Sequence, residues 1–167
     1  QQVPFVEASR KAGTPSYIAV DGTRFENGVD AGLYPNSRFP DQKLEAEAVF
    51  VGYGLDAPTQ GFDDYPGLDV RGKIAVALWG FPSGAPSEIS AHLLNEKARM
   101  AKARGAIGVL NLQTPVIEGI VPWERRRLWA NDPDVKWVRP DGTPDYPGPD
   151  LPVTGYLGPK AAEALFA

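Results

Sequence analysis

Two apolar stretches, KIAVALW at residues 73–79 and AIGVLNL at residues 106–112, decide the fold of this chain. Both are rich in aliphatic and β-branched side chains, and their nearly continuous apolar character is typical of strands buried on both faces of a sheet. Between them, residues 89–104 place apolar side chains three or four positions apart, which is the period of an amphipathic helix. Strand, helix and strand predict a βαβ unit, in which two parallel strands are joined by a right-handed crossover.

The predicted crossover helix has recognisable ends. Ser87 or Ser90 could cap its N-terminus, because a serine side chain accepts a hydrogen bond from a backbone amide of the first turn. Gly105 is placed where a glycine commonly ends a helix by adopting the left-handed conformation. We therefore expect the helix to end at about Arg104.

Further strands are predicted on both sides of this unit. Residues 46–55 (AEAVFVGYGL) and 151–157 (LPVTGYL) are strand candidates because of their β-branched and aromatic side chains. Residues 17–20 (YIAV) form another, and the turn pair Asp21-Gly22 would lead into a hairpin partner at residues 23–26.

The remaining segments complete the fold prediction. Pro159 can occupy the first turn of a C-terminal helix that extends to about Phe166. Residues 27–43 and 56–68 are expected to be irregular. The fold class is therefore α/β and β-rich, with a mixed sheet or open β-barrel-like core, one βαβ crossover helix and a short C-terminal helix.

Composition describes a folded domain of ordinary size. The chain has 167 residues, of which 43% are hydrophobic and 23% charged, values typical of a single globular domain. Its net charge of −4 argues against binding to nucleic acid, which would require a basic surface. No apolar run approaches the roughly 18 residues of a membrane span, and we expect no signal peptide in this chain.

Candidate catalytic groups are few. The chain has no cysteine, which excludes thiolate catalysis and thiolate zinc sites. Its single histidine, His92, is too few for a usual catalytic zinc site. An acidic cluster leaves a calcium or magnesium site open in principle, although its spacing does not match a calcium loop; its members are Asp56, Asp63, Asp64 and Asp69. We expect no metal, no cofactor and no catalytic residue in this chain.

Two other kinds of site can be compared with the sequence. A serine nucleophile would need Ser83 with His92 as its base, but GFPSG at residues 80–84 does not have the Gly-x-Ser-x-Gly spacing of a nucleophile elbow. The glycines of Gly52-Tyr53-Gly54 and Gly72-Lys73 match neither a dinucleotide-binding nor a P-loop pattern. We interpret them as residues that allow tight turns at strand ends.

Residues 113–150 form a long segment dense in proline and tryptophan, with no predicted element. Such a stretch is unusual in a compact domain, and it suggests a lid or contact segment. Tryptophan and arginine are common anchors at protein–protein contacts. A candidate contact surface is therefore formed by Trp123, Arg125, Arg126, Arg127, Trp129 and Trp137.

The order of several motifs resembles the protease-associated (PA) domain. The resemblance is carried by AEAVFVGYGLDAP at residues 46–58 and FDDYPGLDVRGKIAVALWGFPSG at residues 62–84, followed by the helix and its Gly-Ala turn at residues 105–106. It covers residues 44–112 well and 151–166 moderately, and it does not extend to residues 113–150. The motif residues are Gly52, Tyr53, Gly54, Asp64, Tyr65, Asp69, Gly72, Lys73 and Gly105.

The resemblance is strongest to the PA domain inserted in di-zinc aminopeptidases of the family that includes glutamate carboxypeptidase. It implies a swivelling β/β/α fold and one non-catalytic domain cut from a larger, secreted or periplasmic peptidase. It also implies that zinc belongs to the peptidase domain, which would be the partner of this chain, together with a peptide or protein substrate. Two alternatives stay open: a freestanding peptide- or carbohydrate-binding module that uses exposed tryptophans, and a cryptic serine hydrolase.

Overall fold

A five-stranded sheet forms the centre of the computed structural model, which describes residues 3–34, 36–146 and 148–167. Its strand order is β4 (Ala31–Leu33), β11 (Val153–Leu157), β9 (Gly108–Leu112), β8 (Ile74–Leu78) and β5 (Ala48–Phe50). The last four strands run parallel, whereas β4 pairs antiparallel with β11. The sheet is mixed and open at β4 and β5, so the predicted β-rich α/β fold class is confirmed.

The predicted βαβ unit is present as β8, α1 (Ser87–Ala103) and β9. The two strands pair in parallel, from Ile74 opposite Gly108 to Leu78 opposite Leu112. The predicted serine cap is wrong. The helix starts directly after Pro86, whose carbonyl oxygen accepts the first helical hydrogen bond from Ser90, and no side chain caps this end.

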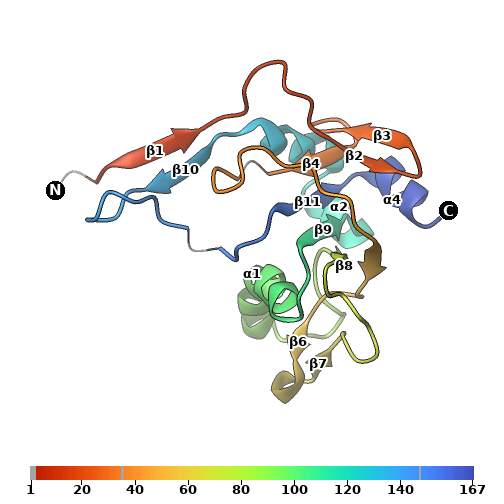
Figure 1. Cartoon of the computed structure of the whole chain (residues 1–167). Helices are drawn as coiled ribbons and strands as arrows, with labels where there is room; N and C mark the ends of the chain where they lie inside the picture. The colour runs from red at the N-terminus through yellow and green to blue at the C-terminus, as the bar shows by residue number, and fades with distance from the viewer. Residues whose placement is uncertain (1–2, 35, 147) are drawn as a thin grey trace.

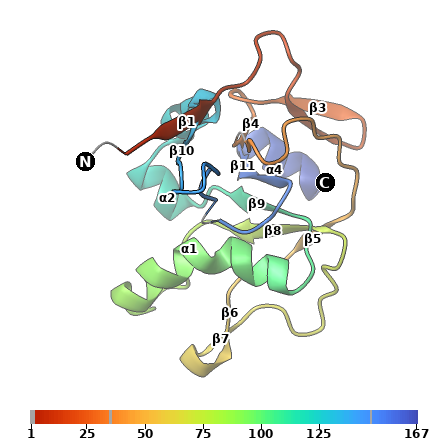
Figure 2. The same ribbon diagram turned by 60° about the vertical axis from the view of Figure 1, so that its left-hand side comes forward.

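The two faces of the sheet are covered by different elements (Figure 2). On one face, α1 buries Leu93, Lys97 and Ala101, and the side chains of Val109 and Leu151 belong to the same apolar cluster as Ala101. The other face packs against α4 (Pro159–Leu165) and the hairpin of β2 (Tyr17–Val20) and β3 (Thr23–Glu26). Both the hairpin and the C-terminal helix were predicted from the sequence.

The predicted strand at residues 46–55 is shorter than expected, because β5 ends at Phe50. Gly52 and Gly54 adopt φ values of +59° and +70°, which turn the chain out of the extended conformation. The backbone nevertheless stays beside β8, since Val51 donates to the carbonyl oxygen of Val76. The glycines therefore shape the end of the strand, as the sequence suggested.

The segment at residues 113–150 is more ordered than predicted. It contains α2 (Pro115–Ile120), α3 (Trp123–Arg126), a 3-10 helix at Arg127–Asn131 and β10 (Asp134–Trp137). Strand β10 pairs with β1 (Phe5–Ala8), and the resulting ribbon extends away from the central sheet (Figure 1). The expectation of a structureless segment overlooked this pairing, because the partner strand lies more than 120 residues earlier in the chain.

The other two predicted loops also contain short elements. Strand β4 lies within residues 27–43, and residues 56–68 contain β6 (Asp56–Ala57), a 3-10 turn at Pro58–Gln60 and β7 (Phe62–Asp63). Positions 35 and 147, within the segments 27–43 and 113–150, lie outside the described residues. None of the described helices is long and apolar enough to cross a membrane.

Candidate functional site

The predicted catalytic and metal candidates are not assembled into a site. Ser83 and His92 are both exposed, and no hydrogen bond joins them in the described chain. The described residues contain no group of three or more His, Cys, Asp or Glu side chains that could hold a metal ion. In the acidic cluster, Asp56 forms a two-bond ion pair with Arg104 and Asp64 accepts a hydrogen bond from the Leu55 amide.

The motif residues form a structural frame at both ends of the parallel strands β5 and β8. The Asp64 carboxylate closes the loop after β5, because its Oδ2 atom lies 2.9 Å from the Leu55 amide. Tyr65 is buried in the apolar cluster beneath α1, and burial raises the pKa of its hydroxyl. Asp69 caps the turn before β8 by accepting from the amide of Arg71, and Lys73 forms a 2.8 Å ion pair with Glu47.

Lys97 is a second structural residue and is only 3% exposed. Its ammonium group donates to the carbonyl oxygens of Leu78 and Gly80 over 2.9 and 2.7 Å, which holds α1 to the end of β8. Three aromatic rings, those of Tyr53, Trp79 and Phe81, lie within 5.7 Å of its nitrogen. Burial lowers the pKa of Lys97 to about 8.

The candidate binding site is a cavity of about 500 Å³ beside the β4–β11 edge of the sheet. Its aromatic walls include Tyr34, Trp129 and Tyr146, and the charged groups around it include Arg38, Asp132, Asp134 and Lys136. The volume lies in the range of small-ligand sites, which combine aromatic walls with a few placed polar groups. We call this feature the edge cavity.

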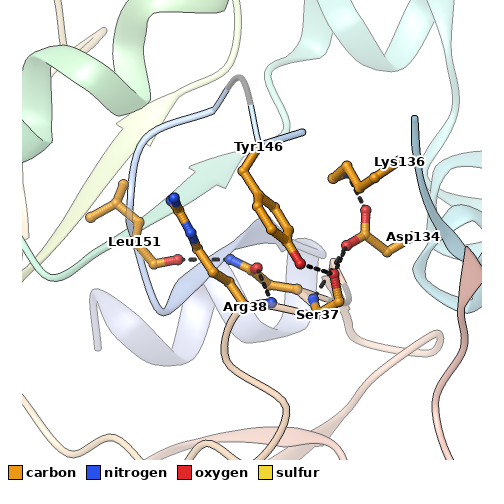
Figure 3. Close-up of polar contacts among 7 residues, drawn as sticks. Ser37, Arg38, Asp134, Lys136, Tyr146 and Leu151 are labelled. Atoms are coloured by element: carbon orange, nitrogen blue, oxygen red, sulfur yellow. Dashed lines mark hydrogen bonds and ion pairs between the residues drawn. The ribbon is translucent and has the colours of Figure 1, made fainter. Parts of the chain in front are cut away.

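A polar network fixes the wall of the edge cavity (Figure 3). Asp134 on β10 forms an ion pair with Lys136 and accepts two hydrogen bonds from Ser37, one from the backbone amide and one from the hydroxyl. The Ser37 and Tyr146 hydroxyls are 3.1 Å apart. Burial alone would raise the pKa of Asp134, but the hydrogen bonds from Lys136 and Ser37 outweigh burial and hold it below its ordinary value.

Arg38 extends the same wall. Its guanidinium lies 4.8 Å from the centre of the Tyr146 ring and forms an ion pair with Asp150. Together with the Asp134 network, these contacts join loops from both halves of the sequence at the border of the cavity. Asp132 differs from these groups, since its carboxylate has no ion pair within the described part of the chain.

The predicted tryptophan and arginine surface is divided between the interior and the exterior. Trp123 and Arg126 are each only 6% exposed, which corrects their assignment to a contact surface. The Trp123 indole nitrogen donates to the carbonyl oxygen of Val29, so this side chain anchors α3 to the loop before β4. Trp129 is 37% exposed and lines the edge cavity.

The other members of that predicted surface lie outside the cavity. Arg125 is exposed on α3, and Arg127 binds the carbonyl oxygen of Gly28 and the carboxylate of Glu124. Trp137 is 43% exposed and faces Phe5 across the β1–β10 ribbon. Of the predicted contact residues, only Trp129 therefore lines the edge cavity in the described structure.

Sequence reasoning missed most of the cavity wall, including Tyr34, Arg38, Asp134 and Tyr146. They lie in two distant segments without any recognisable motif, and they are joined by contacts of Ser37 with Asp134 and of Arg38 with Tyr146 that the sequence does not reveal. Lys97 offered a usable signal, because it occupies an inward position of the amphipathic stripe on α1.

Comparison with known proteins gives little further information. No protein-family model matches the chain, and no curated protein matches it. Among solved structures, it is similar to an aminopeptidase from Aneurinibacillus sp. strain AM-1, with a TM-score of 0.44 and 17% sequence identity. The similarity covers 99% of this chain and 30% of the aminopeptidase chain. At this TM-score it does not establish a common fold, and the functional proposal rests on other observations.

Proposed function

We propose that this chain is a non-catalytic protease-associated domain of a secreted or periplasmic zinc-peptidase-like protein, and that it holds a peptide segment in the edge cavity. The peptidase domain would be its partner and would carry the zinc. One observation supports this most directly: the PA-like motif residues form the frame, whereas most of the residues that line the cavity lie in segments that depart from the motif pattern. Such a division is expected of an accessory domain that presents a variable binding surface on a fixed scaffold.

The chemistry of the edge cavity is suited to a peptide. Tyr34, Trp129 and Tyr146 offer flat apolar surface with polar edges, while Arg38 and Asp132 supply charges of opposite sign. Aromatic side chains of this kind contribute large contact area at a low cost in conformational entropy. The same rings could also stack on sugars, so an oligosaccharide is the competing ligand class.

The proposal has two direct tests. Pure protein should not hydrolyse aminoacyl-nitroanilides, with or without added zinc, and turnover that follows the protein through purification would overturn the non-catalytic role. Titration of intrinsic tryptophan fluorescence should detect binding of short peptides but not of oligosaccharides. A response to sugars alone would favour the freestanding carbohydrate-binding module instead.

Two tryptophan variants locate the binding. Trp129→Ala should weaken peptide binding about tenfold or more, because it removes one wall of the cavity. Trp137→Ala is the matched control, since Trp137 is similarly exposed but does not line the cavity. Equal loss of affinity in both variants would place the peptide elsewhere.

A further inference from the structure

Two buried cations lie near the Trp79 ring, and they differ in the hydrogen bonds that their charged groups make. The Lys97 nitrogen is 5.7 Å from the ring centre and the Arg126 guanidinium carbon is 6.0 Å from it. Lys97 donates hydrogen bonds to two carbonyl oxygens. Arg126 is as deeply buried, yet its Nε atom has no hydrogen-bond partner and no carboxylate pairs with it in the described residues.

Aromatic rings surround the Arg126 guanidinium. Its carbon lies 4.5 Å from the centre of the Tyr156 ring and 5.4 Å from that of Trp129. Cation–π contacts and hydrogen bonds with the hydroxyls of Tyr34 and Tyr156 offset part of the cost of burying this charge, but they leave its Nε–H without an acceptor. A guanidinium in this state strongly favours an anionic acceptor.

The Arg126 cluster and the edge cavity share a wall. Trp129 lines the cavity and packs on Arg126, and Tyr34 lines the cavity and makes an edge-on ring contact with Tyr156 at 5.6 Å. Burial raises the pKa of Tyr34, while hydrogen bonds with Tyr156 and Arg126 and the charge of Arg126 oppose this shift. The guanidinium is therefore close to the Tyr34 hydroxyl at the cavity wall.

A second unsatisfied polar atom belongs to Asn111, a neighbour of Tyr156 in the sheet. Asn111 is the register partner of Tyr156 on the neighbouring parallel strand, so both side chains point to the same face of the sheet. Its Oδ1 atom is buried without a hydrogen-bond partner, while its Nδ2 atom donates to the carbonyl oxygen of Gly155. Unsatisfied buried polar atoms are uncommon in folded proteins, and two of them, Arg126 Nε and Asn111 Oδ1, belong to neighbours of Tyr156, which indicates a polar ligand.

We propose that Arg126 binds the carboxylate of a short peptide seated in the edge cavity, with the hydroxyls of Tyr34 and Tyr156 beside it. This inference rests on the proposed peptide-binding function and specifies which part of the peptide is recognised. A monoanion matches the single charge of Arg126, whereas the second charge of a phosphate dianion would face the carboxylate of Asp132, which lines the same cavity without an ion pair in the described residues. The carboxylate can come from the peptide C-terminus or from an acidic side chain.

Three peptides distinguish these sources: acetyl-trialanine with a free carboxylate, its C-terminal amide, and an acetylated amide with one glutamate. Isothermal titration of the full chain should give at least tenfold tighter binding for a peptide with a carboxylate than for the neutral amide, because charged hydrogen bonds contribute about 1.5–3 kcal/mol. If only the free acid binds tightly, the site recognises the C-terminal carboxylate of the peptide. If only the glutamate peptide binds tightly, the site recognises an acidic side chain.

Variants connect the preference to Arg126. Arg126→Gln should abolish the difference in affinity between the acid and the amide peptides, and Arg126→Lys should retain part of this difference. Arg125 is an exposed neighbour on the same helix, so Arg125→Gln should leave the difference unchanged. Since Arg126→Gln could unfold the chain, the comparison of acid with amide on the unaltered protein stands independently as a test.

The outcomes separate the two proposals. Equal binding of all three peptides would overturn the carboxylate site while leaving peptide binding intact. Failure of every peptide to bind would overturn both. Peptide hydrolysis by the pure chain would overturn the accessory role but not the site.

Discussion

The backbone amide of Gly72 donates a 3.0 Å hydrogen bond to the carbonyl oxygen of Gly105, which joins the turn before β8 to the turn after α1. Gly105 has a φ of +92°, and a Cβ atom added there would lie 2.7 Å from Cγ of Arg71. Gly105→Ala therefore introduces both backbone strain and a steric clash. We expect it to lower the free energy of unfolding by about 1–3 kcal/mol, as measured by urea denaturation.

Gly119→Ala is the control for this substitution. Gly119 lies within α2, its φ is not positive, and no atom lies within 4 Å of an added Cβ. Alanine should be neutral or stabilising there by up to about 1 kcal/mol, because it favours the helix. If both variants had the same urea midpoint as the unaltered chain, an alanine at position 105 would not introduce the backbone strain and steric clash that we expect.

The burial of Lys97 predicts that the free energy of unfolding changes with pH in the alkaline range. Burial lowers its pKa in the folded chain from 10.5 to about 8. Between these values the unfolded chain retains a proton that the folded chain has released, so the free energy of unfolding rises with pH across this interval. The neutral amine still donates its hydrogen bonds to Leu78 and Gly80.

The measurement compares the unaltered chain with Lys97→Met at about pH 7 and pH 9.5. The unaltered chain should gain roughly 2 kcal/mol relative to the variant over this interval. This is an upper limit, because the aromatic rings around Lys97 favour its charged form. Lys102→Met, at an exposed position of the same helix, should show the pH dependence of the unaltered chain. Parallel curves for Lys97→Met and the unaltered chain would contradict the lowered pKa.

The contacts of Asp134 predict that the stability of both the edge cavity wall and the β1–β10 ribbon depends on this one carboxylate. Asp134→Asn removes the charge that pairs with Lys136 and weakens the hydrogen bonds from Ser37. We expect a loss of about 1–3 kcal/mol in the free energy of unfolding and faster hydrogen exchange in β1 and β10. Asp41→Asn, at an exposed position, should change neither quantity. An Asp134→Asn chain with unchanged exchange in the ribbon would show that its pairing is independent of this network.

The sequence predicted the parts of the fold that depend on local patterns. The strands around α1, the β2–β3 hairpin and the C-terminal helix all have a clear period or a turn pair, and they were found close to their observed positions. Strands β1, β4 and β10 were missed because each has only three or four residues and is defined by a distant partner. Local propensity carries no information about such pairing.

The candidate site was less predictable for the same reason. Trp129, which was predicted to lie on a contact surface, is exposed and lines the edge cavity, but Trp123, six positions earlier, was assigned to the same surface and is buried. Trp123 lies in α3 and Trp129 in the 3-10 helix that follows it, and the two side chains differ in whether they point into the protein or toward solvent. Segments this short have too few residues for the sequence to define a polar and an apolar side. The unsatisfied Arg126 likewise becomes apparent only once its neighbours are known.

The burial of Trp123 leads to the last prediction. Its ring packs so closely on Gly158 that a Cβ atom at that position would lie 2.6 Å from Cε2 of the indole. Trp123→Ala should lower the free energy of unfolding by about 3–5 kcal/mol, because it empties a buried site and leaves the Val29 carbonyl without its donor. Trp137→Ala should change it by less than about 1 kcal/mol, since that ring lies on the exposed ribbon. Thermal and urea unfolding of both variants provide the comparison, and similar small losses for the two would mean that Trp123 is a surface contact residue after all.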